Sequence, residues 1–474
     1  FTLDFVFIVA NSRYTTLLAT AVDTSDNNNI TDASTNNHSI TVNGDAHAGT
    51  FSPYRSGGYS TYFDGAGDYL NAPASATFEF GTGDFSMELF FYRTVGGSVD
   101  TLIQYGNASV TGYQQISWTL YISSSNYLSF EISDGTPGGA GKLLLVSSVL
   151  FPTNSWVHIS VVRDGNDFTL YQNGNSVATI TDNRSVYVSP TPLLWIARNH
   201  NAGTGDTAGF FSNVRIIKGT AVYTSNFTLP SEPLTAITGT SLLTCHLPYI
   251  ADGSTNDHSI TINGDVSTKP FSPYDYNEYS ATDHGGSVYF DGSGDYLDTN
   301  SAINLSSGGC IEGWVYITSA TNYAFFIAST QGTPGYPRWY VGHSNATDWR
   351  CSPGDSTDNN ITSYDLIKNQ WNHFVLSNDG STSRLFANGI LIFTKSVTPV
   401  NENLTFAFSK YGSSAQYLMI GNLSDVRVTT SIPTEYQTSS TTVGSSIFTP
   451  PTAPLSSSGA ELHIKGTDAS IIDK

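Results

Sequence analysis

The sequence predicts an all-β protein built from two tandem antiparallel β-sandwiches. Long motifs occur twice in the same order, and short β-rich runs alternate with turn dipeptides along the chain. The chain has 474 residues, which is enough for two domains that each bury a core of their own.

The repeated motifs keep both their order and their spacing. STNNHSITVNGD at Ser34–Asp45 corresponds to STNDHSITINGD at Ser254–Asp265, and YFDGAGDYL at Tyr62–Leu70 corresponds to YFDGSGDYL at Tyr289–Leu297. Corresponding motifs lie between about 210 and 230 residues apart, a domain length that far exceeds one solenoid repeat. Two copies of one domain therefore account for nearly the whole chain.

The predicted division places one sandwich at residues 32–238 and a second at residues 239–474. The boundary follows the link at Leu229-Pro230, after which a strand is expected around Ser241. Residues 1–31 are expected to form N-terminal strands or the end of a preceding unit, and residues 460–474 resemble the start of a third. The alternative, that these strands close the sandwich of the preceding copy, stays open.

Strand signals are dense in both copies, and helix signals are rare. Phe85–Tyr92 (FSMELFFY) and Trp156–Val162 (WVHISVV) are short runs rich in β-branched and aromatic residues. Asn-Gly pairs, which tolerate the positive φ of tight hairpins, follow such runs at Asn173-Gly174 and Asn388-Gly389. This pattern of short strands and close turns favours an antiparallel sandwich.

Composition excludes several classes of function. Charged residues make up only 12% and the net charge is −20, so nucleic acid, which needs clustered Lys and Arg, is not expected as a partner. No apolar run is long enough for a membrane-spanning helix, so membrane insertion is not expected. The three cysteines, Cys245, Cys310 and Cys351, are predicted to be separate buried thiols, although the last two share one copy and could pair.

Taken together, the motifs resemble the laminin-G-like, concanavalin A-like jelly roll. They are YFDGxGDYL, a Glu in the next apolar strand (Glu88, Glu312), Trp-x-His, Leu-aromatic-x-Asn-Gly and [SND]VR[IV]. The stretch Ser212–His246 is similar to the form found in tandem in structural proteins of marine bacteriophages, and the second copy departs from it after Arg427. The resemblance implies adhesion or carbohydrate-binding modules on fibres or capsids, sometimes with calcium at the rim.

Two acidic turns are candidate calcium sites. Asp64 and Asp68 surround one pair of glycines, and Asp291 and Asp295 surround another. Calcium binds carboxylate and carbonyl oxygens from such loops. The same residues also suit a plain turn, and the sequence favours that interpretation.

Aromatic side chains in loop-like stretches are candidate platforms for sugar rings. The candidates are Tyr54, Tyr59, Tyr336, Trp339 and Tyr340. The alternative, which the sequence favours, is that each ring is simply packed.

Catalysis is not expected. Glycoside hydrolysis requires two carboxylates around the scissile bond, whereas the strands with Glu88 and Glu312 offer one each. Each is predicted to be a structural Glu, hydrogen-bonded near a sheet edge. The Trp-x-His pairs predict a buried Trp with a hydrogen-bonded His at His158 and His373.

These observations predict a non-enzymatic protein of the virion surface, a phage fibre or capsid decoration that mediates adhesion or binds host glycan. Its expected partners are other virion or filament subunits, further copies of itself and a host cell-surface glycan. Alternatives are a secreted bacterial adhesin or filament subunit, or an architectural spacer without a ligand. A polysaccharide-degrading enzyme is disfavoured by the missing pair of carboxylates.

Overall fold

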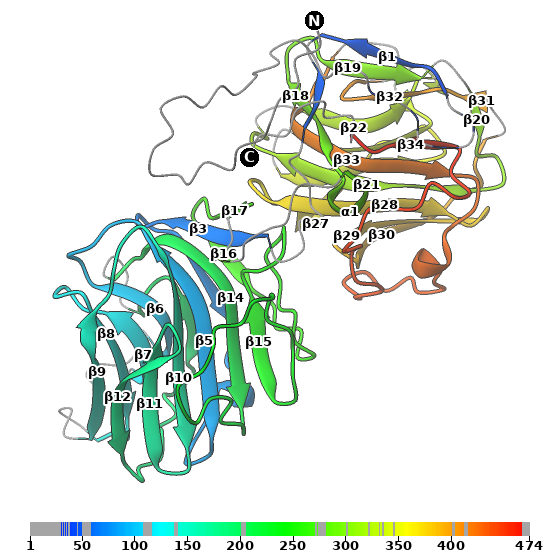
Figure 1. Cartoon of the computed structure of the whole chain (residues 1–474). Coiled ribbons are helices and arrows are strands. Elements are labelled where there is room, and N and C mark those ends of the chain that lie inside the picture. The colour runs from blue at the N-terminus through cyan, green and yellow to red at the C-terminus, as the bar shows by residue number, and fades with distance from the viewer. Residues whose placement is uncertain are drawn as a thin grey trace, which may run out of the picture.

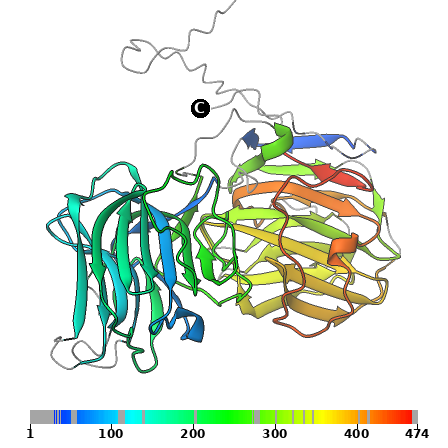
Figure 2. The same cartoon turned by 60° about the horizontal axis from the view of Figure 1, so that its bottom comes forward.

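The computed structural model confirms the all-β fold class, with two bodies of packed antiparallel sheets that lie against each other (Figures 1 and 2). The structure describes residues 30–466 except 31, 33, 35, 37, 45, 50–57, 108–115, 137–140, 201–204, 271–272, 274–280, 300–301, 321–322, 331, 334–335, 345–346, 401–402 and 412–415. No helix in this part of the chain is both long enough and apolar enough to cross a membrane.

The first sandwich pairs an eight-stranded sheet with a seven-stranded sheet. The eight-stranded sheet has the order β12 (Asn175–Thr181), β11 (Asp167–Gln172), β10 (Trp156–Asp164), β5 (Phe85–Arg93), β14 (Ala208–Lys218), β3 (Ser60–Asp64) and β17 (Ser267–Lys269), with β15 (Thr240–Thr244) also on β14. The seven-stranded sheet has the order β16 (Thr261–Asn263), β4 (Tyr69–Ala72), β13 (Leu193–Ile196), β6 (Asp100–Gly106), β7 (Ile116–Ile122), β8 (Tyr127–Ser133) and β9 (Lys142–Leu150).

The second sandwich repeats this arrangement. Its eight-stranded sheet has the order β2 (His47–Gly49), β18 (Ser287–Asp291), β33 (Ile420–Thr429), β21 (Gly309–Ile317), β28 (Trp371–Asn378), β29 (Thr382–Ala387) and β30 (Ile390–Ser396), with β34 (Leu462–Ile464) on β33. Its seven-stranded sheet has the order β1 (Ile40–Asn43), β19 (Tyr296–Thr299), β32 (Phe406–Phe408), β22 (Ala324–Ser329), β25 (Trp339–His343), β26 (Asp348–Pro353) and β27 (Asn359–Asp365). Minor elements are the pairs β20 (Ile303–Asn304) with β31 (Asn403–Leu404) and β23 (Gly332–Thr333) with β24 (Tyr336–Pro337), helix α1 (Ala281–His284), and the 3₁₀ turns Ala76–Phe78 and Thr434–Tyr436.

Each core lies between the two sheets of its sandwich, because strand residues point alternately to opposite faces. On β10, Val157, Ile159 and Val161 all belong to the first core. The second core is a separate cluster that includes Trp349. The three cysteines are free and buried, which confirms the prediction of separate thiols.

The strand pairing differs from the predicted domain boundaries. In the first sandwich, β15, β16 and β17 pair with β14, β4 and β3, although all three lie beyond residue 238. Reciprocally, β1 and β2 pair with β19 and β18 of the second sandwich. A repeat in the sequence gives the period of the chain, but it does not give the residue at which each folded unit begins.

The strands flanking each copy close the sandwich of the copy before them, which is one of the two options that the sequence left open. β15 pairs with β14 and β34 pairs with β33. The strands expected within residues 1–29 and 467–474 lie outside the described residues.

Candidate ligand-binding site

A long segment, here called the strap, crosses the outer face of each eight-stranded sheet and connects two neighbouring strands of that sheet. The first strap is residues 219–239, between β14 and β15, and the second is residues 430–461, between β33 and β34. Aromatic rings attach each strap to the sheet. Tyr223 and Phe227 stack on each other at 3.6 Å between centroids, and Phe227 contacts His158 and Tyr171.

A buried polar cluster lies beneath the first strap. Glu88 Oε1 accepts hydrogen bonds from Arg215 Nε at 2.9 Å and Nη2 at 2.5 Å, and Oε2 accepts one from the Tyr223 hydroxyl at 2.8 Å. His158 Nε2 lies 3.2 Å from the same Oε2. Burial alone would raise the pKa of Glu88, but the His158 contact and the Arg215 charge outweigh burial and lower it. The charged glutamate therefore holds the strap through Tyr223.

The corresponding cluster beneath the second strap has fewer hydrogen bonds, and the Tyr436 hydroxyl has no hydrogen-bond partner among the described residues. Arg427 donates to Glu312 Oε1 from Nε at 2.6 Å, but neither ring nitrogen of His373 has a hydrogen-bond partner among the described residues. Burial raises the pKa of Glu312 to about 7, although the Arg427 charge opposes it. The predicted hydrogen-bonded His is therefore confirmed at His158 and wrong at His373.

Both glutamates lie on interior strands rather than near a sheet edge. Glu88 is on β5, between β10 and β14, and Glu312 is on β21, between β28 and β33. The prediction of a structural, hydrogen-bonded Glu is confirmed, but its predicted place near an edge is wrong. A central strand is fully covered here because the strap lies over it.

The Asn-Gly turns also attach the straps. Asn173 Oδ1 accepts the His158 backbone N–H at 2.9 Å, and the next carbonyl, of Gly174, accepts the Phe227 N–H at 2.9 Å. In the second sandwich, Asn388 and Gly389 make the same contacts with their own histidine and strap. Most of the motif residues noted in the sequence therefore act together at one place.

A polar hollow of about 600 Å³ opens where the second strap meets the β28–β29 hairpin. Its lining includes Asn378, Asp379, Arg384, Gln437 and Thr438. Arg384 Nη1 donates to Asp379 Oδ2 at 2.9 Å, and 38% of the Asp379 side chain is exposed. Burial opposes ionisation of Asp379, but the bonds from Arg384 and the adjacent turn outweigh it and lower its pKa. A fixed charge pair thus lies at the edge of an open cavity.

The first sandwich has a hollow of about 430 Å³ at the same place, between its strap and the β10–β11 hairpin. Its lining includes Asp164, Asp167, Thr169 and the strap residues Tyr223 and Thr224. The arginine of the second hollow has no counterpart among these lining residues. The two hollows therefore share a position but present different chemistry.

Three of the five candidate aromatic platforms are buried, in agreement with the favoured alternative that these rings are packed. Tyr59 lies between the two sandwiches, where its hydroxyl accepts a hydrogen bond from Trp371 Nε1 at 3.1 Å. Trp339 and Tyr340 belong to strand β25 rather than a loop, and at most 1% of either is exposed. Tyr54 lies outside the described residues, as does the side chain of Tyr336 in β24.

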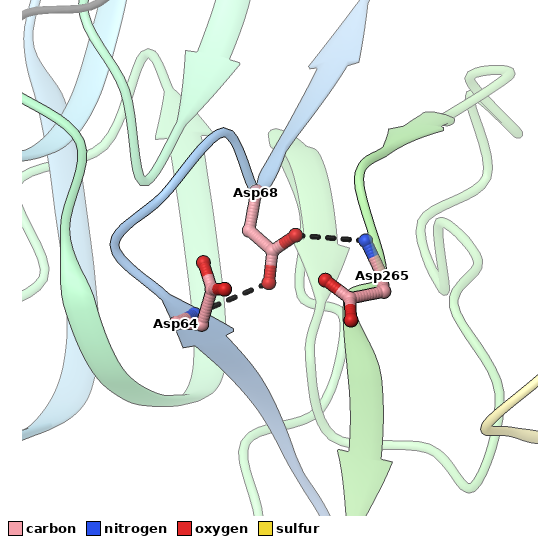
Figure 3. A group of neighbouring side chains, drawn as sticks. All are labelled: Asp64, Asp68 and Asp265. Carbon is pink, nitrogen blue, oxygen red and sulfur yellow. Dashed lines mark hydrogen bonds between the residues drawn. The ribbon is translucent and has the colours of Figure 1, made fainter.

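The acidic turn of the first sandwich brings together Asp64, Asp68 and a third carboxylate that the sequence analysis missed, Asp265 (Figure 3). One oxygen from each lies within 4.8 Å of the others. Asp68 Oδ2 accepts the Asp64 N–H at 3.1 Å, and its Oδ1 accepts the Asp265 N–H at 2.8 Å. Asp265 ends the repeated Asn-Gly-Asp motif, which was the only available signal for its role.

The Asp68 carboxylate binds the backbone of Asp265, from the second copy of the repeated motif, as well as the backbone of its own turn. Burial raises its pKa, and the amide bonds from Asp64 and Asp265 oppose that rise. In the second sandwich, Asp295 is likewise buried, and its Oδ2 accepts the Asp291 N–H at 2.9 Å. The four predicted residues thus form two separate turns, one in each sandwich.

A family model described as the concanavalin A-like lectin/glucanases superfamily matches residues 64–221 and 291–436, which together make up more than half of the chain. The chain belongs to this superfamily. The laminin-G-like resemblance noted in the sequence is therefore confirmed for both sandwiches. No curated protein matches the chain.

Among solved structures, this superfamily member is similar to a "putative carbohydrate binding protein" from Bacteroides ovatus ATCC 8483, with 16% identity, 46% of this chain covered and a TM-score of 0.32. The match spans 62% of that protein, less than two thirds of its length. It is also similar to mouse laminin alpha1 chain domains LG4-5, with 11% identity, 81% of this chain and 91% of the other covered, and a TM-score of 0.28. These likenesses are too distant to bear on function.

The two lectin/glucanase sandwiches are expected to respond to pH in opposite directions. The raised pKa of Glu312 gives stability that is complete below its ordinary pKa of 4.5 and is lost as pH rises through about 7. The lowered pKa of Glu88 gives stability that is present above pH 4.5 and is lost as pH falls below it. In calorimetric unfolding between pH 5 and 8, the midpoint of the second-sandwich transition should fall as pH rises. The fall should correspond to a loss on the order of 2 kcal/mol in the free energy of unfolding.

The variant Glu312→Gln supplies the control, because glutamine keeps the shape of the side chain without titrating. Its second-sandwich transition should no longer move between pH 5 and 8. If the transition moves as far as in the wild type, Glu312 is not the group responsible.

Proposed function

We propose that this chain is a non-enzymatic glycan-binding protein, with its principal site in the hollow of the second sandwich. The observation that carries this proposal is the lining of that hollow, which combines hydroxyl and amide groups with the Arg384–Asp379 pair. Sugars offer many hydroxyl groups, and side chains of this kind both donate and accept hydrogen bonds. A volume of about 600 Å³ also lies in the range of ordinary ligand pockets.

The absence of catalysis is proposed on the positions of the carboxylates. Glu88 and Glu312 are buried beneath the straps and paired with arginine, so a polysaccharide could not contact them. Asp379 is the one carboxylate among the described residues that line the larger hollow. Acid–base hydrolysis of a glycoside requires two such groups on opposite sides of the bond.

Blocking the hollow is expected to abolish glycan binding without unfolding the protein. Ser439 lines the hollow and is exposed, so Ser439→Trp should fill the cavity. The exposed Ser458 lies outside the lining residues, and Ser458→Trp is the matched control. Screening on a glycan array should identify a ligand whose affinity falls at least tenfold in Ser439→Trp and not in the control.

We also propose that the protein is displayed on a virion or another extracellular surface, where it meets host glycan beside other copies of itself or other subunits. The similarity of Ser212–His246 to phage structural modules supports the virion, and a secreted adhesin or filament subunit is the second candidate. An architectural spacer would bind no glycan on the array, and that result would contradict both binding proposals. Several copies on one surface would increase avidity.

Calcium is proposed as a ligand of Asp64, Asp68 and Asp265. Three carboxylates this close repel one another, and a divalent cation that binds carboxylate oxygen would offset the repulsion. Millimolar calcium should therefore raise the unfolding midpoint of the first sandwich by several degrees relative to chelator. Asp64→Asn should remove this gain, whereas Asp182→Asn, at a carboxylate outside the cluster, should keep it. Equal midpoints with calcium and with chelator would leave Asp68 as a turn residue only.

A further inference from the structure

Each sandwich is completed by an arm that lies next to the other repeat in the sequence. The first arm is residues 32–49, which contain β1 and β2 and complete the second sandwich. The second arm is residues 252–269, which contain β16 and β17 and complete the first sandwich. We call the strands that contact an arm its seat: β3, β4 and β15 in the first sandwich, and β18, β19 and β34 in the second. Figure 1 shows the first arm, in blue, lying on the C-terminal body beside β19 and β18.

In the first sandwich, one aspartate fixes the start of the arm. Asp252 Oδ1 accepts the backbone N–H groups of Leu243 at 3.1 Å and Ser254 at 2.9 Å. Its Oδ2 accepts the His258 N–H at 2.9 Å and the Ser254 hydroxyl at 2.9 Å. Because Leu243 belongs to β15, these bonds join the arm to the last strand of its seat, nine residues earlier in the chain.

In the second sandwich, Asp32 makes the same four bonds. Its Oδ1 accepts the N–H groups of His463 and Ser34, each at 2.8 Å. Its Oδ2 accepts the His38 N–H and the Ser34 hydroxyl, again each at 2.8 Å. Here the arm and β34 are 431 residues apart. The seat therefore holds its arm by the same contacts, whatever the length of chain between them.

The far ends of the two arms also match. Gly264 of the second arm lies so close to Asp68 that a Cβ atom would collide with its carboxylate, and Gly44 of the first arm lies in the same way against Asp295. In the first sandwich, the seat takes the arm of the repeat that comes next in the chain. The seat of the second sandwich takes the first arm, so each sandwich contains an arm that adjoins the other repeat.

We propose that the seat of the second sandwich also accepts residues 32–49 of a second copy of this chain, joining copies head to tail. The contacts would be those already described, so exchange between chains sacrifices none of them. The arm of one chain and the seat of the next are different surfaces, and such contacts form rings or open filaments. This inference does not depend on glycan binding.

Concentration decides between the closed and the joined forms. Nine residues separate Gly49 from Tyr59, and a tether this short gives an effective concentration in the millimolar range. Joining should therefore compete with closure when the chain itself approaches about millimolar concentration, as on a crowded surface.

Cysteine cross-linking across the β1–β19 register tests the proposal. Thr41 lies opposite Asp298, and the three native thiols are buried. Full-length chains carrying Thr41→Cys alone are mixed with chains carrying Asp298→Cys alone, concentrated to about millimolar and oxidised. A covalent heterodimer should form in at least tenfold excess over a control mixture with the exposed Ser381→Cys in place of Asp298→Cys.

The double variant Thr41→Cys/Asp298→Cys separates a failed proposal from a failed fold. At low concentration it should cross-link within one chain, which verifies that the arm is seated. The proposal is overturned if the double variant closes in this way while the mixed single variants give no more heterodimer than the control.

Discussion

Glu88→Ala is expected to destabilise the first sandwich by about 3–5 kcal/mol, because it leaves the Arg215 charge buried without its partner. The substitution also removes the acceptor of the Tyr223 hydroxyl, so the strap should loosen before the sandwich unfolds. Calorimetry should show a large fall in the first transition, and hydrogen exchange of strap amides such as Phe227 N–H should accelerate.

Two further variants separate this mechanism from a general loss of charge. Glu232→Ala removes an exposed carboxylate from the same strap and should change stability by less than about 0.5 kcal/mol. The pair Glu88→Leu/Arg215→Met replaces both charges by apolar groups and should lose less stability than Glu88→Ala alone. If the double variant is the less stable of the two, the ion pair itself supplies net stability and the argument from an orphaned charge fails.

The fold class was predictable because the alternation of residue types along a sandwich strand reflects which side chains face the core. On β10, apolar Val157, Ile159 and Val161 alternate with residues that face the strap, so period-two patterning identifies the strand and its core face. The duplicated motifs then give two sandwiches without further argument. The agreement extends to the three cysteines, which are buried thiols as expected of free cysteine.

The division between the sandwiches was not predictable from the same patterns. Ile40–Asn43 and Thr261–Asn263 have very similar surroundings in sequence, so nothing local tells which sandwich each one completes. That choice depends on which edge strand lies nearby in space. Pairing between distant segments is a property of the folded chain. A sequence repeat leaves open which of the two similar arms pairs with which sandwich.

The sequence identified several residues of the candidate site, but it did not show that they lie together in the fold. Trp-x-His, Leu-aromatic-x-Asn-Gly and the strand glutamate were each noted, yet their common role beneath the straps depends on Arg215 and Tyr223 approaching from other elements. Trp339 and Tyr340 were misread as loop residues because glycine and proline precede them. Asp265 was missed because its partners lie about 200 residues earlier, beyond any local pattern.

Gly174→Ala is expected to destabilise the first sandwich by about 3 kcal/mol, through two effects that add. Gly174 has φ near +74°, where a Cβ atom is disfavoured, and that Cβ would collide with the carbonyl oxygen of Phe227 in the strap. The strap would have to move away and give up the bond from Phe227 N–H to Gly174 O. Calorimetry of the first-sandwich transition measures the loss.

Gly165→Ala separates the two effects, because Gly165 occupies another hairpin turn of the same sheet with φ near +59° and open space around its missing Cβ. Only the cost of placing a Cβ atom at positive φ applies there, so this variant should lose about 1 kcal/mol in the free energy of unfolding. The difference between the two variants then measures the contact of the strap with the turn. Equal losses would mean that the turn carries only a backbone requirement, and that the Asn-Gly motif does not attach the strap.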